Sequence, residues 1–132
     1  MNLEKKIKSI ATELAPEAIG PYSQAVIAGD FLFLSGQLPI DPSCGEFVHG
    51  DIKNQTRQIF ENIKAIALAA KTDMNRIVKT TVFMNDISEF QEMNEVYAEY
   101  VGSVLPARSA IQAAKLPKNA NIEIETIFYL PG

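Results

Sequence analysis

The feature that most restricts the fold of this 132-residue chain is the segment 31–35, FLFLS, which begins with four consecutive large apolar side chains. Successive residues of a β-strand point to opposite faces of a sheet, so a strand of this composition needs burial on both faces. Gly29 and Asp30 precede it and suit a two-residue turn from another apolar segment, 25–28. The sequence therefore predicts a β-hairpin in a sheet that is covered on both sides.

Apolar periodicity predicts two helices. Asp51 can cap the first helix, whose apolar residues recur at helical spacing as far as Ala70. The second is expected to start with a capping box, formed by Ser88 and Gln91, and to end at Gly102 in a left-handed C-terminal cap. Besides the hairpin, strands are expected at 7–11, 77–84, 108–113 and 121–130, with a turn-rich segment at 39–50 and a turn centred on Pro117.

This order of elements predicts an α+β fold in which both helices pack on one face of a sheet of five or six strands. Without internal repeats or linker-like composition, a single domain over residues 1–132 is expected. Two helices cannot cover both sheet faces, so the second face is expected to meet further copies of the chain in a closed oligomer. The alternative is a monomer with an exposed apolar surface.

Charge and composition disfavour several classes of protein. The formal net charge is −4, which leaves no excess of Lys and Arg to neutralise a phosphate backbone, so nucleic-acid binding is not expected. The single cysteine cannot form an intrachain disulfide, which suits a reducing compartment, and a cytoplasmic location is expected. Residues 1–9 lack the apolar core of a secretory signal, and the apolar run 63–70 is too short to cross a bilayer, so no membrane association is expected.

Metal and nucleotide sites are also not expected. One histidine, His49, and one cysteine, Cys44, cannot supply the ligands of a typical zinc site, and the aspartates do not cluster as a magnesium site requires. The glycines match neither a P-loop nor a dinucleotide-binding motif. As catalytic base or nucleophile, His49 and Cys44 lack identifiable partners.

Four other residues are candidates for chemistry. Gly36 directly follows an apolar strand, which indicates a turn or, less often, close approach of a ligand to the backbone. Arg108 opens an apolar strand and needs an anion, which could be a glutamate of the protein or a substrate carboxylate. Alternation along the last strand places Glu123 and Glu125 on one face with large apolar residues, where desolvation and ion pairing would set the carboxyl pKa.

A set of short motifs occurs in order along most of the chain. These are AIGPYSQA (18–25), SGQLP (35–39), VKTTVF (78–83), PARS (106–109), KLP (115–117) and IEIE (122–125). In this combination the sequence resembles the reactive intermediate deaminase (Rid, or YjgF) family. The resemblance implies a chorismate-mutase-like fold, a homotrimer with a central barrel of sheets, and clefts between subunits. It also implies cofactor-independent hydrolysis of 2-aminoacrylate, 2-iminobutyrate and related 2-enamino and 2-imino acids to 2-keto acids and ammonia.

The resemblance also assigns residues. Arg108 would grip the substrate carboxylate and Glu123 would activate water. The pocket would be lined by Tyr22, Ser35, Gly36, by Asn94 from a neighbouring chain, and by Ala110, which stands where many members carry cysteine. Two alternative functions are weighed beside this one: a non-catalytic regulator that binds small carboxylates or keto acids, and an endoribonuclease, which the acidic net charge disfavours.

Overall fold

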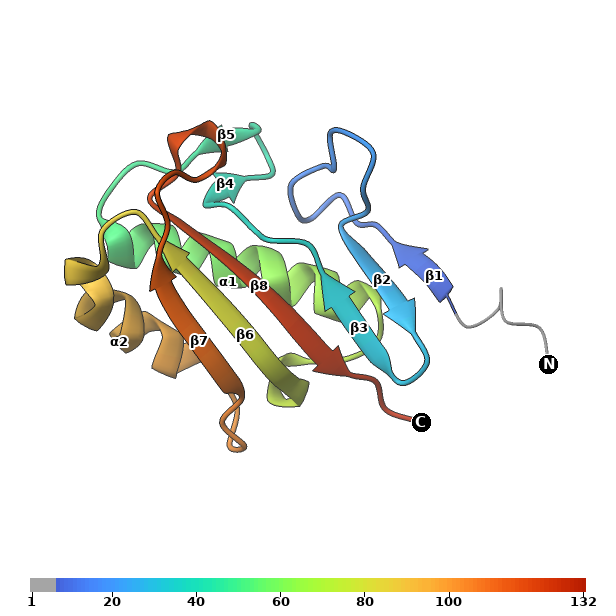
Figure 1. The fold of residues 1–132 in the computed structure, drawn as a ribbon. Helices are drawn as coiled ribbons and strands as arrows, with labels where there is room; N and C mark the ends of the chain where they lie inside the picture. Colours follow the sequence, from blue (N-terminus) through green and yellow to red (C-terminus); the bar gives the residue numbers. More distant parts are fainter. Residues whose placement is uncertain (1–6) are drawn as a thin grey trace.

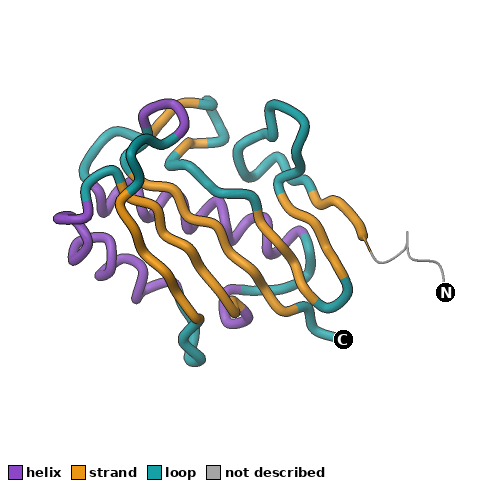
Figure 2. The backbone as a smooth tube through the Cα atoms, viewed as in Figure 1, coloured by secondary structure: helices purple, strands orange, loops and turns teal. Residues whose placement is uncertain are grey.

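The computed structural model describes residues 7–132, which form a six-stranded sheet with two helices on one face (Figures 1 and 2). The strand order is β1-β2-β3-β8-β6-β7, with β6 and β7 parallel and the other neighbours antiparallel. The α+β class is therefore confirmed. The sheet strands are β1 (Ile7–Ile10), β2 (Ala25–Ala28), β3 (Phe31–Leu34), β6 (Ile77–Met84), β7 (Ala107–Gln112) and β8 (Ile122–Tyr129).

The remaining elements connect and cover these strands. The helices are α1 (Ile52–Ala69) and α2 (Phe90–Tyr100), and β4 (Ile40–Asp41) pairs with β5 (Glu46–Phe47). Short 3₁₀ turns are η2 (Met74–Arg76), η3 (Ile87–Glu89) and η4 (Pro117–Asn119). No helix within residues 7–132 combines the length and the apolar composition needed to span a membrane.

The predicted hairpin is present. Ala28 pairs with Phe31 across the two-residue turn, and Gly29 has a φ of 60°, a left-handed conformation that favours glycine. The predicted cap of α1 is also confirmed, because the Asp51 side chain accepts a hydrogen bond of 3.0 Å from the backbone N–H of Asn54.

One face of the sheet forms the core with the helices. Alternate residues of β8 are buried there, including Ile122, Ile124 and Phe128, and Leu32 of β3 packs among them. On the helix side, Ile59, Phe60 and Met93 are fully buried. Alternation in each strand therefore decides which residues reach the core.

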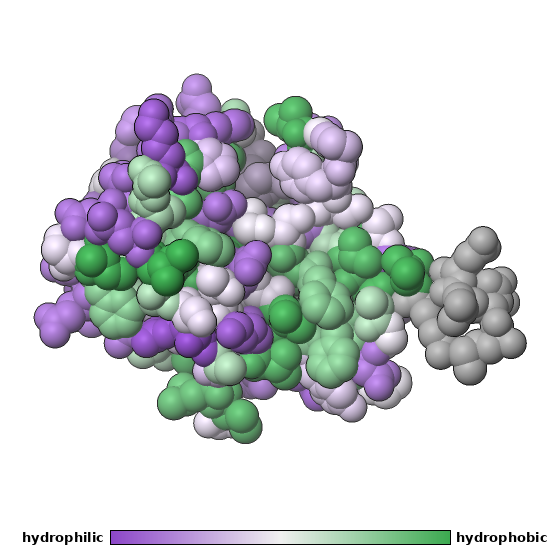
Figure 3. Space-filling model, in the orientation of Figure 1, coloured by the Kyte–Doolittle hydropathy of each residue, from purple (hydrophilic) through white to green (hydrophobic). Residues whose placement is uncertain are grey.

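The other face of the sheet, which we call the open face, is not covered by the described chain and is the face seen in Figure 3. Phe31 and Phe33 of β3 are 41% and 43% exposed there, and Tyr129 and Ile111 are 44% and 49% exposed. Phe31 packs edge-on against Tyr129 at 6.1 Å between ring centroids. The expectation that one chain leaves an apolar sheet face uncovered is met, and its cover by other copies stays a prediction.

The predicted capping box of the second helix is wrong. Ser88 lies in η3, where its backbone N–H and its hydroxyl both donate to the Asp86 carboxylate, at 3.0 and 2.7 Å. α2 begins only at Phe90 and has no side-chain cap. The Asp86 carboxylate caps the η3 turn by accepting both hydrogen bonds from Ser88. The Ser88 hydroxyl is therefore not used to cap α2.

The predicted left-handed cap at Gly102 is wrong as well. α2 ends at Tyr100, Val101 is extended with φ −76° and ψ 149°, and Gly102 is not among the residues with positive φ. Glycine is required there by packing, because a Cβ atom would lie 2.7 Å from the Cα of Asn75.

Candidate active site

The first half of the candidate site is a pocket of about 450 Å³ at the ends of β3 and β8. Gln37 joins these two strands by backbone hydrogen bonds to Ile124, with N···O distances of 2.8 and 3.1 Å. Four residues assigned from the sequence line this pocket, namely Tyr22, Ser35, Gly36 and Glu123, together with apolar residues such as Ile19, Leu38 and Pro117. The structure therefore brings together residues that lie far apart in the chain, such as Tyr22 and Glu123.

Gly36 has a different role from the turn favoured by its place after a strand. Its φ is not positive, so a left-handed turn does not require glycine here. Instead, a Cβ atom at this position would lie 2.8 Å from Cδ of Glu123 and even closer to Oε2. The missing side chain makes room for the Glu123 carboxylate, so the close approach seen at Gly36 is that of a protein side chain, and the approach of a ligand stays a prediction.

Glu123 is partly buried on the open face of β8, opposite Phe83 of β6. Burial raises the pKa of its carboxyl, and the neighbouring negative charge of Glu125 raises this pKa further. A carboxylate of this kind is a stronger base than an ordinary glutamate once it is ionised. The common face of Glu123 and Glu125, predicted from alternation, is present in β8.

Ser35 and Tyr22 form other parts of the pocket wall. The Ser35 hydroxyl donates a 2.6 Å hydrogen bond to the Ser23 carbonyl, so its proton is already committed within the protein. Tyr22 is 55% exposed and lies at the rim.

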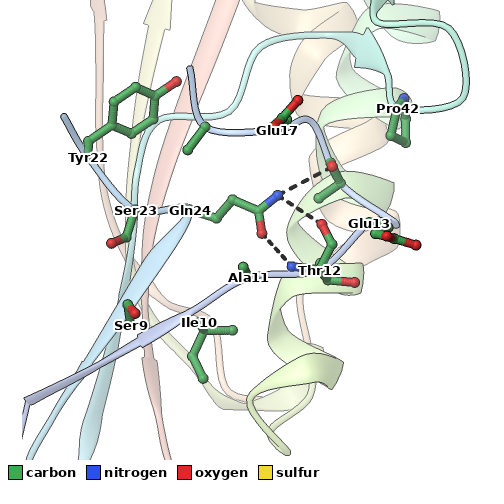
Figure 4. A pocket seen from close by; sticks show the side chains of 12 residues that line it. Ser9, Ile10, Ala11, Thr12, Glu13, Glu17, Tyr22, Ser23, Gln24 and Pro42 are labelled. Carbon is green, nitrogen blue, oxygen red and sulfur yellow. Dashed lines mark hydrogen bonds between the residues drawn. The ribbon is translucent and has the colours of Figure 1, made fainter. Parts of the chain in front are cut away.

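A neighbouring, larger pocket of about 680 Å³ shares Glu17, Tyr22 and Gln24 with the first but contains neither Glu123 nor Arg108. In Figure 4 the Gln24 side chain crosses the base of the loop that leads to Tyr22, with its amide turned toward Thr12. Its amide accepts from the Thr12 N–H at 2.7 Å and donates to the carbonyls of Thr12, Ala15 and Pro16. These hydrogen bonds hold the loop between β1 and β2 in place, so we assign this pocket a structural role. Sequence reasoning missed Gln24, because one polar residue before an apolar strand carries no distinctive signal.

The second half of the candidate site surrounds Arg108 at the edge strand β7. Arg108 pairs with Thr80, which is fully buried on the helix side, so the arginine lies on that side of the sheet. Its Nη1 donates a 2.6 Å hydrogen bond to Oδ1 of Asn94. Its guanidinium carbon lies 4.6 Å from the ring centre of Tyr97 and 5.2 Å from that of Phe90.

The alternative of a structural ion pair for Arg108 finds no support, since the guanidinium forms no ion pair with a carboxylate of residues 7–132. Asn94 contacts Arg108 within the same chain, so these two side chains would face a cleft together from one subunit, and their approach to the pocket of a neighbouring chain stays a prediction. Ala110 pairs with buried Val82 and so shares the helix side of β7 with Arg108.

Within one chain the two halves face away from each other. Glu123 belongs to the open face and Arg108 to the helix side, so a single ligand cannot reach both groups through the sheet of one chain. His49 and Cys44 line other surface hollows and do not reach the Glu123 pocket. Among residues 7–132, no three His, Cys, Asp or Glu side chains gather in a way that could hold a metal ion.

Comparison with known proteins matches this chain to one family along most of its length. The family model described as Endoribonuclease L-PSP covers residues 12–130. A RutC family protein of Pyrococcus horikoshii is 58% identical over 120 residues, which are 91% of this chain and 95% of that protein. The human 2-iminobutanoate/2-iminopropanoate deaminase is 46% identical over 89% of this chain and 86% of its own length.

A solved structure agrees with these matches. E. coli TdcF with bound serine superposes with a TM-score of 0.87 at 43% identity, covering 94% of this chain and 99% of that one. Family model, sequence relatives and fold thus agree, and the chain belongs to the Rid family, which the matching model describes as endoribonuclease L-PSP.

Proposed function

We propose that this protein hydrolyses small 2-imino and 2-enamino acids to 2-keto acids and ammonia. The observation that carries the proposal is the Glu123 carboxyl, which has a raised pKa and lies over Gly36 in a pocket sized for a small molecule. The human relative, whose name states this activity, is similar over most of both chains. No metal or cofactor takes part in the proposed reaction.

The proposed site forms between subunits of a homotrimer. Arg108 and Glu123 face opposite sides of one sheet, so a ligand held by both requires Arg108 from one chain and the Glu123 pocket from another. The apolar open face gives such an assembly its driving force, because Phe31, Phe33 and Ile111 are each more than 40% exposed in the single chain. A closed ring of three copies would cover all three open faces.

In the proposed mechanism, Arg108 fixes the substrate carboxylate with two parallel hydrogen bonds. An enamine first tautomerises to the imine, by moving a proton from nitrogen to C3. Glu123 then accepts a proton from water as the water oxygen bonds to C2, and it returns this proton to the nitrogen as the C=N π bond opens, which gives a carbinolamine. When the carbinolamine collapses, the hydroxyl proton moves to the nitrogen, the C–N bond breaks, ammonia leaves and the C=O bond of the 2-keto acid forms.

This chemistry needs little from the protein. Imines already hydrolyse in water, and positioning with one general base typically gives about 10²- to 10⁴-fold acceleration. One arginine and one carboxylate are sufficient for that. The free thiol of Cys44 is consistent with a cytoplasmic setting for the reaction, which is part of the proposal.

A second candidate is a regulator that binds small amino or keto acids without turnover. The relative solved with bound serine favours it, because a carboxylate clamp binds an unreactive amino acid as well as an imine. Cleavage of RNA, which the description of the family model suggests, is disfavoured by the net charge of −4.

The deciding experiment mixes the protein with freshly generated 2-iminobutyrate and follows formation of 2-ketobutyrate against the spontaneous rate. The proposal requires a faster rate that Arg108→Ala abolishes in a folded protein. Binding of serine or 2-ketobutyrate without acceleration would establish the regulator instead. A parallel incubation with single-stranded RNA tests whether the protein cleaves RNA.

A further inference from the structure

Arg108 lies on an aromatic and polar support made by one side of α2. Phe90, Asn94 and Tyr97 follow one another at intervals of four and three residues, which places them on the same side of the helix. All three contact the guanidinium group, two through their rings and one through a hydrogen bond. The arginine is thus held by the helix, although its own strand is at the edge of the sheet.

The Tyr97 side chain is itself held in place by residues of β6 and α1. Its hydroxyl shares a 2.8 Å hydrogen bond with the hydroxyl of Thr80, and Thr80 is fully buried on β6. Its ring packs edge-on against Phe60 of α1 at 5.6 Å between centroids. The ring under the guanidinium is therefore anchored at both its hydroxyl end and its side, and Tyr97 is only 6% exposed.

A supported guanidinium differs from a free one in entropy. A long arginine side chain loses rotamer freedom when it binds an anion, and this loss weakens binding unless the side chain is already held. Within residues 7–132, Asn94 is the hydrogen-bond partner found for Arg108, so most of its five N–H donors stay free for a ligand.

We infer that Tyr97 is a positioning residue, which holds Arg108 ready for the carboxylate of the substrate. This inference rests on the proposed function for the identity of the ligand, but not for the order of the Arg108 side chain. Phe90 supports the same guanidinium from the start of α2. Tyr97 does not contact the reacting atoms in this assignment.

The test measures the order of Arg108 and catalysis separately. The NMR order parameter of the Arg108 Nε–Hε group reports whether the side chain is held, and it requires no substrate. In Tyr97→Leu this order parameter should fall below roughly 0.6, the range of flexible groups. KM for 2-iminobutyrate should rise roughly 3- to 10-fold with a smaller change in kcat, because the loss lies in binding.

Tyr100 gives a matched control on the same helix. Its ring stacks on Phe60 at 5.0 Å and its hydroxyl donates to Glu61, away from Arg108. Tyr100→Leu should therefore leave both the order of Arg108 and KM unchanged. Tyr97→Phe keeps the ring and loses only the bond to Thr80, so its effects should be smaller than those of Tyr97→Leu.

The outcomes separate this inference from the proposed function. An Arg108 signal as ordered in Tyr97→Leu as in the wild type would overturn the positioning role, and so would equal losses in Tyr97→Phe and Tyr97→Leu. If the wild type shows no turnover, the proposed reaction fails, while the order parameter and serine affinity still decide the role of Tyr97. If Tyr97→Leu does not fold, Phe90→Leu takes its place with the same expected directions.

Discussion

At the scale of single residues, the two candidate catalytic groups differ in how the protein prepares them. Arg108 is exposed, carries no ion pair with a described carboxylate and keeps donors free. Glu123 is partly buried, and its charged form is disfavoured by its surroundings. The first group is suited to binding an anion and the second to accepting a proton, so their substitutions should have different kinetic effects.

Replacing Arg108 by lysine keeps the charge but loses the planar fork that can hold a carboxylate with two hydrogen bonds. We expect Arg108→Lys to lower kcat/KM for 2-iminobutyrate roughly 10- to 100-fold, and Arg108→Ala to lower it further. Steady-state kinetics on the purified assembly measures this, with His49→Ala as the unaffected control. A wild-type rate in folded Arg108→Ala would remove the carboxylate clamp from the mechanism.

Replacing Glu123 by glutamine keeps its shape and removes the base. We expect kcat to fall roughly 10²-fold or more while affinity for 2-ketobutyrate changes little. The wild-type rate should decline as the pH falls through the raised pKa of Glu123, at a higher pH than for an ordinary glutamate. Glu125→Gln removes one cause of that shift and should move the decline to lower pH, which a pH–rate profile would show.

The same pKa shift has a consequence for stability. A carboxyl with a raised pKa in the folded state favours folding at low pH, and this contribution is lost as the pH rises through the folded pKa. Glu123→Gln should therefore raise the melting temperature at neutral pH, and the difference from wild type should shrink in acid. Equal melting temperatures of the two proteins at neutral pH would show that burial of the ionised Glu123 carboxylate does not destabilise the folded state.

Close packing at Gly36 should matter for activity, whereas close packing at Gly102 should matter for stability. Gly36→Ala places a methyl group against the Glu123 carboxylate, a movable side chain, so we expect lost activity with a small loss of stability. Gly102→Ala meets the backbone of Asn75, which cannot move away, so we expect a destabilisation of about 1–3 kcal/mol. Urea unfolding and kinetics on both variants measure the contrast, and a fully active Gly36→Ala would contradict the close-approach assignment.

At the scale of elements, the start of α2 shows how neighbouring caps compete. Asp86 holds the η3 turn, and Ser88 only donates to it. We expect Asp86→Ala to lower the free energy of unfolding by about 0.5–2 kcal/mol, and Ser88→Ala by less than about 0.5 kcal/mol. Asp51→Ala, which removes the cap of α1, serves as the reference for a lost cap. Urea titrations at one protein concentration measure these changes. A larger loss of stability in Ser88→Ala than in Asp86→Ala would support the capping box at Ser88 instead.

At the scale of the whole molecule, the open face of the sheet is the surface that the proposed assembly depends on. Light scattering of the wild type should give about three chain masses. Phe33→Glu puts a charge among Phe31, Ile127 and Tyr129 and should abolish the trimer and the activity while the chain stays folded. Leu68→Glu, at a position 57% exposed on α1, is the control and should keep both. A wild-type monomer at micromolar concentration would contradict the intersubunit site.

The features that depend on neighbours in the chain could be predicted from the amino-acid sequence. Gly29 and Asp30 specify the tight turn, Asp51 caps the helix that follows it, and alternation along β8 places Glu123 and Glu125 on one face. Each of these features depends either on the two-residue repeat of a strand or on the backbone conformation of one or two residues. Both can be recognised from a few neighbouring residues in the sequence. The order of motifs along the chain was enough for the family.

How these elements meet depends on packing between distant parts of the chain and was seen only in the fold. The sequence did not give the register that sets Gly36 against Glu123, nor the packing of Gly102 on Asn75 that replaced a predicted cap. It also left open which face of the sheet Arg108 takes, which the pairing with Thr80 settles. The physical reason is that periodicity orders residues within one strand, whereas the face and register of each strand depend on what the other strands and helices bury.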